Sequence, residues 1–376
     1  MVRGPIDIKK HRQWLRSSLI YKEAERLSSQ LEPFVRGQTG GVFVNTHYPN
    51  VEASSVAIKR VVKPEEMLSW NYKDIILYAL ENIHGRVQVH VSQPVFQELA
   101  MSYKPIEYEM ELEKRPKPLL EFSPYHTPVG PGAPLRKLWE LENPKIPRKV
   151  DSLYNERIKA EIALRELMHY DHYYLINLLS AGVLGSKKRM VPTRWAITAT
   201  DDTLSKFYIS RLRDFPEVNE ILMFQHSFLY NHFHIILFPG RWEFENFEAW
   251  APNTSWGAQH GYLITREYED LRGRKNYAES QAGGYYASKY AVSKSLYVMG
   301  RQARVVVIRE VEEGYRIPVG VWQVRESVKK AFTKKPLRFD DREQLLTYLS
   351  HHLKLPLKEY LSRSTILRQR KTLLDF

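Results

Sequence analysis

Residues 221–238 read Ile-Leu-Met-Phe-Gln-His-Ser-Phe-Leu-Tyr-Asn-His-Phe-His-Ile-Ile-Leu-Phe. The runs Ile221–Phe228 and His232–Phe238 have the composition of strands, and the three residues between them predict a turn, so the stretch predicts a β-hairpin. Further elements are expected after it, the strands at 242–250, 304–311 and 317–324 and the helices at 277–299 and 340–353. Because hairpins mixed with helices give no regular β-α-β alternation, we expect an α+β fold with a mainly antiparallel sheet and packed helices.

The sequence before the hairpin is less regular. Helices are expected at 1–30, 73–83, 95–101 and 151–180, and strands at 42–44, 87–91 and 194–200. Residues 104–147 contain nine prolines, a density that interrupts any long regular element. We therefore expect a long proline-rich connector on the surface, docked by aromatic side chains such as Phe122 and Trp139.

These patterns divide the chain of 376 residues into three regions. Residues 1–150 form an N-terminal region with a helix, short strands and the connector. Residues 151–353 form the α+β core, and residues 354–376 form a basic tail. The length is ample for a hydrophobic core.

Composition narrows the classes of function. Lys and Arg number 56 against 43 Asp and Glu, and the resulting formal charge of +13 favours a polyanionic partner such as nucleic acid. The absence of cysteine excludes disulfides, thiolate zinc sites and cysteine nucleophiles. No apolar run has a membrane-spanning length, so we expect a cytoplasmic protein without a membrane partner. No P-loop, dinucleotide or α/β-hydrolase motif occurs.

Clusters of cations supply candidate contacts to nucleic acid. Arg272, Arg274 and Lys275 come just before the helix expected at 277–299, where free backbone N–H groups and positive charge favour a phosphate. Further candidate cations are Lys187, Lys188, Arg189, Arg194 and Arg301. One such run alone is usually a solvated face, but several of them with a charge of +13 favour nucleic-acid binding.

The glycine pair Gly283-Gly284 inside the same helical pattern is unusual, because glycine weakens a helix by roughly 1 kcal/mol relative to alanine. Close approach of another backbone or of a ligand would explain it. Tyr285 and Tyr286 follow directly and could stack on bases, although packing in the core explains them equally well.

Three carboxylates form a candidate catalytic centre. Asp201 follows a predicted strand, and Glu243 and Glu245 alternate onto one face of the strand at 242–250. Paired carboxylates repel unless a cation lies between them, and their oxygens are ligands that Mg²⁺ or Mn²⁺ prefers. The simpler interpretations are a helix cap at Asp201-Asp202 and a solvated strand face at the two glutamates.

The histidines of the hairpin allow a weaker metal hypothesis. His226, His232 and His234 share the parity of a strand, and a His-x-His pair can bind zinc. Without a third ligand, half-buried sheet histidines are the simpler interpretation, and no metal ligand set is assigned.

The last eight residues, 369–376, read Gln-Arg-Lys-Thr-Leu-Leu-Asp-Phe. In one helical turn Leu373 and Phe376 lie on one face and form an apolar plug. The stretch resembles the PIP-type motif with which repair proteins dock on the sliding clamp PCNA, although the glutamine stands one residue early. The alternative is a last helical turn packed on its own domain. Leu374 and Ile366 are expected to make lesser apolar contacts with the clamp, and Arg370 and Lys371 to help electrostatically. Gln369 is a further candidate contact.

Longer segments resemble the archaeal Nre family. They are Gly41–Val44 with His47–Val51, Val191–Lys206, Pro239–Glu245 with Glu248–Trp250, Gly273–Ala287, Gly300–Ala303 and Gly320–Trp322. The resemblance implies repair of DNA damage and recruitment by PCNA through the C-terminus. This chain lacks the N-terminal four-cysteine segment of many family members, so the resemblance carries no zinc to it.

Three hypotheses follow. The first is a cytosolic, clamp-recruited DNA repair protein that binds DNA through its basic C-terminal half. The second is a nuclease that uses Asp201, Glu243 and Glu245 with Mg²⁺ or Mn²⁺. The third is a non-enzymatic RNA- or ribosome-associated factor, and the sequence leaves open whether the protein is an enzyme.

Overall fold

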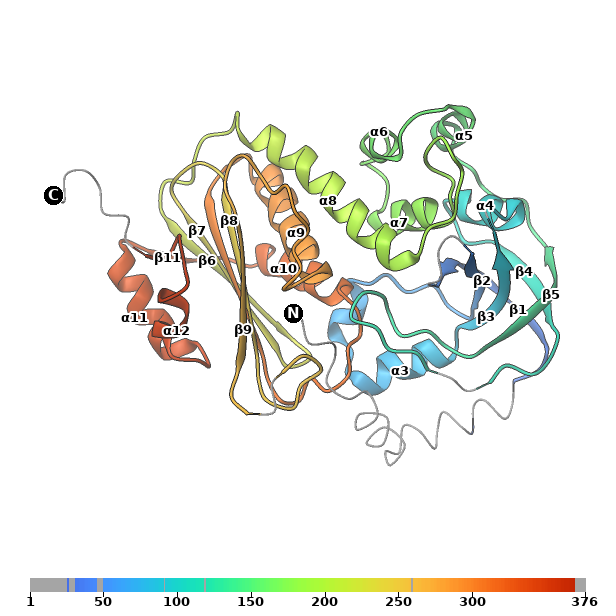
Figure 1. Cartoon of the computed structure of the whole chain (residues 1–376), viewed down its shortest axis with the longest axis horizontal. Coiled ribbons are helices and arrows are strands. Elements are labelled where there is room, and N and C mark those ends of the chain that lie inside the picture. Colours follow the sequence, from blue (N-terminus) through green and yellow to red (C-terminus); the bar gives the residue numbers. More distant parts are fainter. Residues whose placement is uncertain are drawn as a thin grey trace. The chain divides into compact units, whose positions relative to one another are not determined.

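The structure is a computed structural model, in which Arg26 and residues 31–45, 50–90, 92–117, 120–257 and 260–368 are described (Figure 1). The chain divides into two compact units between Leu204 and Ser205. We call the described residues up to Leu204 the barrel unit and those from Ser205 to Arg368 the sheet unit. The sequence analysis placed its first division at residue 150. The helix expected over residues 1–30 lies, except for Arg26, outside the described residues.

Five strands of the barrel unit close into a small barrel in the order β1-β2-β3-β5-β4, with β4 paired to β1. Their bounds are β1 Phe34–Val44, β2 Val51–Ile58, β3 Ile83–Val89, β4 Glu107–Leu112 and β5 Gly132–Glu140. All neighbours are antiparallel except β3 and β5. This order, with one parallel pair and helix α4 (Pro94–Met101) between β3 and β4, is the topology of the OB-fold.

Strand β1 belongs to both halves of the barrel because it bends. Its first half pairs with β4 and its second half with β2. The register shifts between Thr39 and Val42, where Gly41 has φ +100°, a conformation that favours glycine. An added Cβ at Gly40 would lie 2.5 Å from Cγ2 of Ile58, so the bend also requires a residue without a side chain there.

The proline-rich stretch 104–147 is partly the predicted connector and partly barrel. The expectation that it holds no regular element was wrong, because it supplies β4 and β5, and Tyr108 and Met110 of β4 are buried in the barrel core. Eight of the nine prolines fall outside the two strands. Pro134 lies within β5, where the parallel pairing with β3 spans only a few residues.

Helices complete the barrel unit. They are η1 Glu66–Ser69, α3 Tyr72–Leu80, α5 Arg148–Asn155, α6 Ala160–Glu166, α7 His172–Ser180 and α8 Thr193–Leu212. Helix α3 begins at a capping box, in which the side chains of Asn71 and Asp74 each accept the backbone N–H of the other. The helical region predicted at 151–180 is thus three short helices. None of the described helices of the chain is long and apolar enough to cross a lipid bilayer.

Helix α8 replaces the strand predicted at 194–200. The β-branched residues Ile197, Thr198 and Thr200 favour a strand locally. Pro192 precedes the first turn, however, and its carbonyl accepts the N–H groups of Trp195 and Ala196, so the chain enters a helix there. The division between the two units falls within this helix.

The sheet unit contains a six-stranded sheet in the order β11-β6-β7-β10-β8-β9. The strands are β6 Ile221–Phe228, β7 Asn231–Phe238, β8 Glu243–Trp250, β9 Leu263–Glu269, β10 Arg304–Val311 and β11 Leu337–Phe339. The predicted hairpin is confirmed as β6–β7. All neighbours are antiparallel except β10 and β8, so each of the two sheets is mixed. The α+β fold class is confirmed.

Helices cover both faces of this sheet (Figure 1). They are α9 Gly283–Met299, α10 Trp322–Phe332, α11 Arg342–His352 and α12 Leu357–Leu361. Phe247 of β8 packs in a core cluster with Leu345 of α11 and Tyr360 of α12, which defines one face. Figure 1 shows α9 and α10 on the other face. The strand predicted at 317–324 was wrong, because the chain enters α10 at Trp322.

Two buried carboxylates on this sheet fix the C-terminal segment. Glu310 of β10 accepts the N–H groups of Lys354 (2.9 Å) and Leu355 (3.0 Å) and the hydroxyl of Tyr360 (2.7 Å). Residues 354–361 are therefore held on the sheet and belong to the sheet unit rather than to a separate tail.

The second anchor is Glu245 of β8, which is fully buried. Its Oε1 accepts the N–H of Thr365 (2.8 Å), and its Oε2 accepts the N–H of Ile366 (3.2 Å) and the hydroxyl of Ser364. Ile366 and the next residue, Leu367, are buried in the core cluster. The expected contact of Ile366 with a clamp is therefore corrected, because its side chain is part of the sheet unit's own core.

Candidate nucleic-acid interface

The outer face of β2 and β3 carries a row of polar side chains. On β3 these are His84, Arg86 and Gln88, and their register partners on β2 are Val56, Ser54 and Glu52. The intervening Gly85 faces the barrel interior, where an added Cβ would lie 2.9 Å from the sulfur of Met110. The alternation of β3 therefore separates a polar outer row from the core.

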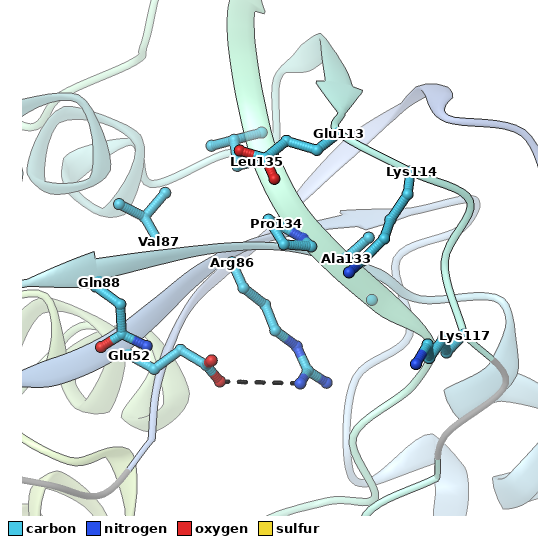
Figure 2. A pocket seen from close by; sticks show the side chains of 11 residues that line it. Glu52, Arg86, Val87, Gln88, Glu113, Lys114, Lys117, Ala133, Pro134 and Leu135 are labelled. Atoms are coloured by element: carbon cyan, nitrogen blue, oxygen red, sulfur yellow. Dashed lines mark ion pairs between the residues drawn. The ribbon is translucent and has the colours of Figure 1, made fainter.

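A groove of about 450 Å³ opens on this face beside β5 (Figure 2). One wall is β3, and the other is the start of the segment that joins β4 to β5. Figure 2 shows the side chains of Arg86, Lys114 and Lys117 around the same open space. Lys114 and Lys117 are exposed, so the groove is bordered by cations from two separate elements.

The floor of the groove contains Gly132 of β5. A Cβ at this position would lie 2.7 Å from the carbonyl oxygen of His84 and 2.9 Å from Nε of Arg86. Only glycine therefore fits between the neighbouring strand and the Arg86 side chain, and its lack of a side chain keeps the groove open.

Acidic residues moderate the charge of the groove. Glu52 pairs with Arg86 at 3.8 Å between Oε1 and Nη1, with about 29% and 28% of the two side chains exposed. At that distance the pair is not a hydrogen bond, and it holds the guanidinium loosely. Glu113 adds a second carboxylate to the lining. Three cations against two carboxylates leave the groove suited to an anion, with Arg86 able to exchange its partner.

Aromatic rings continue the face beyond Arg86. Phe43 of β1 lies edge-on to His84, with 5.9 Å between ring centroids, and edge-on to His126, at 4.8 Å. His126 belongs to the segment between β4 and β5, so that segment covers Phe43 with one residue and borders the groove with Lys114 and Lys117. The β2–β3 face of the barrel therefore carries aromatic rings next to cationic side chains.

The two histidines are uncharged at neutral pH. Burial, followed by the charge of Arg86, lowers the pKa of His84 to about 3, and burial lowers the pKa of His126 to about 4. The neutral His84 shares a hydrogen bond with Ser54, with 2.9 Å between Nδ1 and Oγ.

The depressed pKa of His84 predicts that acid destabilises the barrel unit. Above pH 6.5 the imidazole is neutral in the folded and unfolded states and has no effect. Below pH 6.5 His84 becomes protonated in the unfolded chain, whereas in the folded protein it is protonated only near pH 3. Between these two pH values the free energy of unfolding therefore falls by roughly 1.4 kcal/mol for each unit by which the pH is lowered.

We expect urea denaturation to show this loss of unfolding free energy in the wild type and a smaller loss in His84→Asn. The asparagine keeps a polar partner for Ser54 and does not titrate. From about pH 7 to about pH 5 the wild type should lose about 2 kcal/mol more than the variant. Equal losses would show that His84 is not the titrating group.

In the sheet unit, Tyr285 and Tyr286 are buried, so the core-packing alternative holds for them and stacking on bases is corrected. Tyr285 donates to Oε2 of Glu269 (2.8 Å), and burial raises the pKa of its hydroxyl, which keeps it protonated. Lys289 donates to the same oxygen at 3.2 Å. Lys289 and Glu269 are themselves buried, so these residues form a charged network inside the unit.

The glycine pair stands at the start of α9 rather than inside it. A Cβ on Gly284 would lie 2.6 Å from Oε1 of Glu248, and that oxygen accepts a hydrogen bond of 2.8 Å from Arg309. Close approach to a buried ion pair, not to a ligand, therefore explains the second glycine.

The predicted cations fall into two groups, those with partners inside the protein and those exposed on its surface. Arg274 is paired with Glu267 at 2.5 Å, and the ammonium of Lys188 donates to the carbonyl of Val183 and lies over the ring of Tyr154, so both have internal partners. The exposed ones are Lys187, Arg189 and Arg194 in the barrel unit and Arg272, Lys275 and Arg301 in the sheet unit.

The candidate catalytic carboxylates belong to different units of the chain. Asp201 lies in α8 of the barrel unit and hydrogen bonds Nε2 of His172 at 2.8 Å, and both side chains are buried. Glu243 and Glu245 share one face of β8, as predicted, but belong to the sheet unit.

The two glutamates have protein partners. Glu243 accepts from the hydroxyl of Tyr268 (3.2 Å) and lies 3.6 Å from Nε of Arg304. Glu245 accepts the three donors of the C-terminal segment and Nε of Arg266 at 2.5 Å. A metal ion at Glu245 would have to displace Arg266, and each of the two glutamates has an arginine of its own as its cationic partner.

Two histidines of the β6–β7 hairpin have polar side chains of the sheet unit as partners. His232 is 2.6 Å from Glu312, and His234 is 2.9 Å from the amide nitrogen of Gln225. Burial lowers the pKa of His226 to about 4. Within the described ranges, no three His, Cys, Asp or Glu side chains come together as a metal site.

The predicted clamp-binding residues Gln369, Arg370, Leu373, Leu374 and Phe376 lie outside the described residues. The sequence analysis also missed Arg86, Lys114 and Lys117. The alternation His84-Gly85-Arg86-Val87-Gln88-Val89 is a signal that could have identified the outer row of β3. No local sequence pattern brings Lys114 and Lys117 to this row, because the pairing of β5 with both β3 and β4 does so.

Comparison with known proteins relates most of the chain to one family. The model described as archaeal Nre, N-terminal, matches residues 19–257, and the model described as archaeal Nre, C-terminal, matches residues 269–376. The matched ranges include the groove in the barrel unit and most of the sheet unit.

Three relatives are similar over long stretches. DNA repair protein NreB of Archaeoglobus fulgidus is 32% identical over 325 residues, 84% of this chain and 81% of that protein. DNA repair protein NreA of Haloferax volcanii is 39% identical over 244 residues, 62% of this chain and 58% of that protein. DNA repair protein NreA of Archaeoglobus fulgidus is 35% identical over 263 residues, 68% of this chain and 66% of that protein.

Proposed function

The chain belongs to the archaeal Nre family, and on this premise we propose that it is a DNA repair protein that binds DNA and is recruited to it by the sliding clamp PCNA. The observation that carries the proposal is the match to both family models, whose residues together span most of the chain. The relatives that share these regions are named DNA repair proteins.

Charge supports the DNA-binding part of the proposal. The formal charge is +13, and phosphate contacts by Lys and Arg dominate the affinity of proteins for nucleic acid. Arg86, Lys114 and Lys117 line the same groove on the barrel, and all three are side chains that bind phosphate. We propose that these three cations contact DNA.

The sequence of residues 369–376 supports recruitment by the clamp. Leu373 and Phe376 have the spacing of one helical turn and follow the cations Arg370 and Lys371. The chain up to Arg368 is held on the sheet by Glu310 and Glu245. A clamp bound to residues 369–376 would therefore be tethered to the sheet unit by a short connection.

We expect the protein to bind a labelled DNA oligonucleotide with an affinity that falls steeply as salt rises, because each phosphate contact releases a counterion. Competition at one salt concentration, with unlabelled DNA and with RNA of the same sequence, is the decisive measurement, since phosphate contacts alone do not separate the two. DNA should displace the label at the lower concentration. Stronger displacement by RNA would instead favour an RNA-associated factor.

A further inference from the structure

We propose that the groove on the β2–β3 face of the barrel binds a single strand of DNA. The inference rests on the proposed DNA binding and adds the form of DNA and the residues that contact it. Arg86, Lys114 and Lys117 contact the phosphates of the strand, and the partly exposed rings of Phe43 and His126 form the neighbouring part of the face.

The place of the groove in the fold is the first argument. In barrels of this topology, ligands lie on the face of strands 2 and 3, between the segment joining strands 1 and 2 and the segment joining strands 4 and 5. Here Glu52 and Arg86 line the groove from β2 and β3, and Lys114 and Lys117 line it from the segment between β4 and β5. The groove thus lies on the face with which barrels of this topology bind oligonucleotides.

The shape of the groove is the second argument. Its floor is made by Gly132, Ala133 and Pro134, residues with little or no flexible side chain, while longer side chains form its walls. A duplex keeps its bases stacked inside and presents a convex surface, so it could touch only the rim. A single strand is thin enough to lie in the concavity and place a phosphate between the cations.

The chemistry of the walls is the third argument. A single strand offers phosphates and unstacked bases, and proteins that bind it combine a positive groove with aromatic rings. Gly132 is the register partner of His84 and lies against Arg86, so the groove and the ring cluster are adjacent on one face. The partly exposed rings of Phe43 and the neutral His126 give this part of the face an uncharged surface for bases, and the buried His84 packs edge-on against Phe43. Arg86 and the two lysines supply the charge.

The test compares two double variants of the whole chain with the same change in charge. Lys114→Glu/Lys117→Glu alters the groove, and Lys63→Glu/Lys73→Glu alters exposed lysines of the same unit that do not line it. All four lysines are exposed, so both variants should fold, which circular dichroism checks. Fluorescence anisotropy would measure the binding of a labelled oligothymidylate and of a duplex of equal length at several salt concentrations.

We expect the wild type to bind the single strand more tightly than the duplex. The groove variant should lose about tenfold or more in affinity for the single strand, and the slope of log K against log salt should fall by about 1.4 for two lost phosphate contacts. The control variant should remain within about twofold of the wild type.

The remaining outcomes distinguish a failure of the proposed single-strand site from a failure of the proposed function. If the wild type binds DNA but prefers the duplex, or if both double variants lose affinity equally, the groove is not the single-strand site and only this inference fails. If the wild type binds neither form of DNA, the proposed function itself fails.

Discussion

Replacing Glu245 by alanine is expected to lower the free energy of unfolding of the sheet unit by roughly 3–5 kcal/mol. The carboxylate is fully buried and accepts from the N–H groups of Thr365 and Ile366 and from Nε of Arg266. Alanine leaves the buried N–H of Ile366 and the part-buried N–H of Thr365 without their acceptor, at about 1–3 kcal/mol for each neutral group. The turn that seats Ile366 in the core would also lose its attachment. Urea denaturation followed by tryptophan fluorescence would measure the change.

The matched control for Glu245 is Glu359→Ala. Glu359 pairs with Arg363 at 2.9 Å on the surface, with about 36% and 42% of the side chains exposed, so its loss should cost less than about 1 kcal/mol. Glu245→Gln should fall between the two, since its amide oxygen can still accept some of the donors. A cost for Glu245→Ala as small as that for Glu359→Ala would contradict an anchoring role.

The second large effect is expected at Glu269. In Glu269→Ala the buried ammonium of Lys289 and the buried hydroxyl of Tyr285 lose the oxygen to which both donate. Removing the carboxylate of a buried ion pair is costly, so the free energy of unfolding should fall by roughly 3–5 kcal/mol. The same urea denaturation experiment applies.

Tyr285→Phe separates the hydrogen bond from the ion pair at this site. It removes only the hydroxyl and should cost about 1 kcal/mol, well below the cost of Glu269→Ala. Glu220→Ala, which breaks an exposed pair with Arg338, is the surface control for the loss of a carboxylate. If Glu269→Ala cost no more than Tyr285→Phe, the Glu269–Lys289 pair would not stabilise the fold.

The elements that the sequence predicts well are those whose local pattern agrees with their burial. The β6–β7 hairpin, helices α3, α4 and α11 and the α+β class were all predicted from periodicity and turns. Residues 194–200 and 317–324 were misread as strands because β-branched residues favour strands locally, whereas 194–200 lie in α8 and 317–324 form a loop that enters α10 at Trp322.

The barrel was hidden for a different reason. Its strands β4 and β5 lie in a proline-rich stretch, and the closing pair β1–β4 joins residues about seventy positions apart in the chain. The groove depends on β5, which pairs with β3 on one side and with β4 on the other and so brings the residues after β4 beside Arg86. A local pattern carries no information on such a pairing.

The carboxylates show how one pattern supports two interpretations. Alternation placed Glu243 and Glu245 on one face of β8 correctly, and a metal ion or a solvated surface would follow from the same sequence. The structure supplies donors that no local pattern reveals, from Arg266 on the adjacent strand and from Thr365 and Ile366 at the far end of the chain.

The central claim, a DNA repair protein recruited by the clamp, is tested most directly by gel filtration of PCNA with the whole chain and with a chain that ends at Arg368. This end keeps Ile366 and Leu367, which the core requires, so the fold should be unaffected. Because apolar anchors such as Leu373 and Phe376 typically contribute at least about 1–2 kcal/mol each, co-elution should be lost in the shortened chain and in Leu373→Ala/Phe376→Ala. Undiminished co-elution of the chain ending at Arg368 would contradict the account.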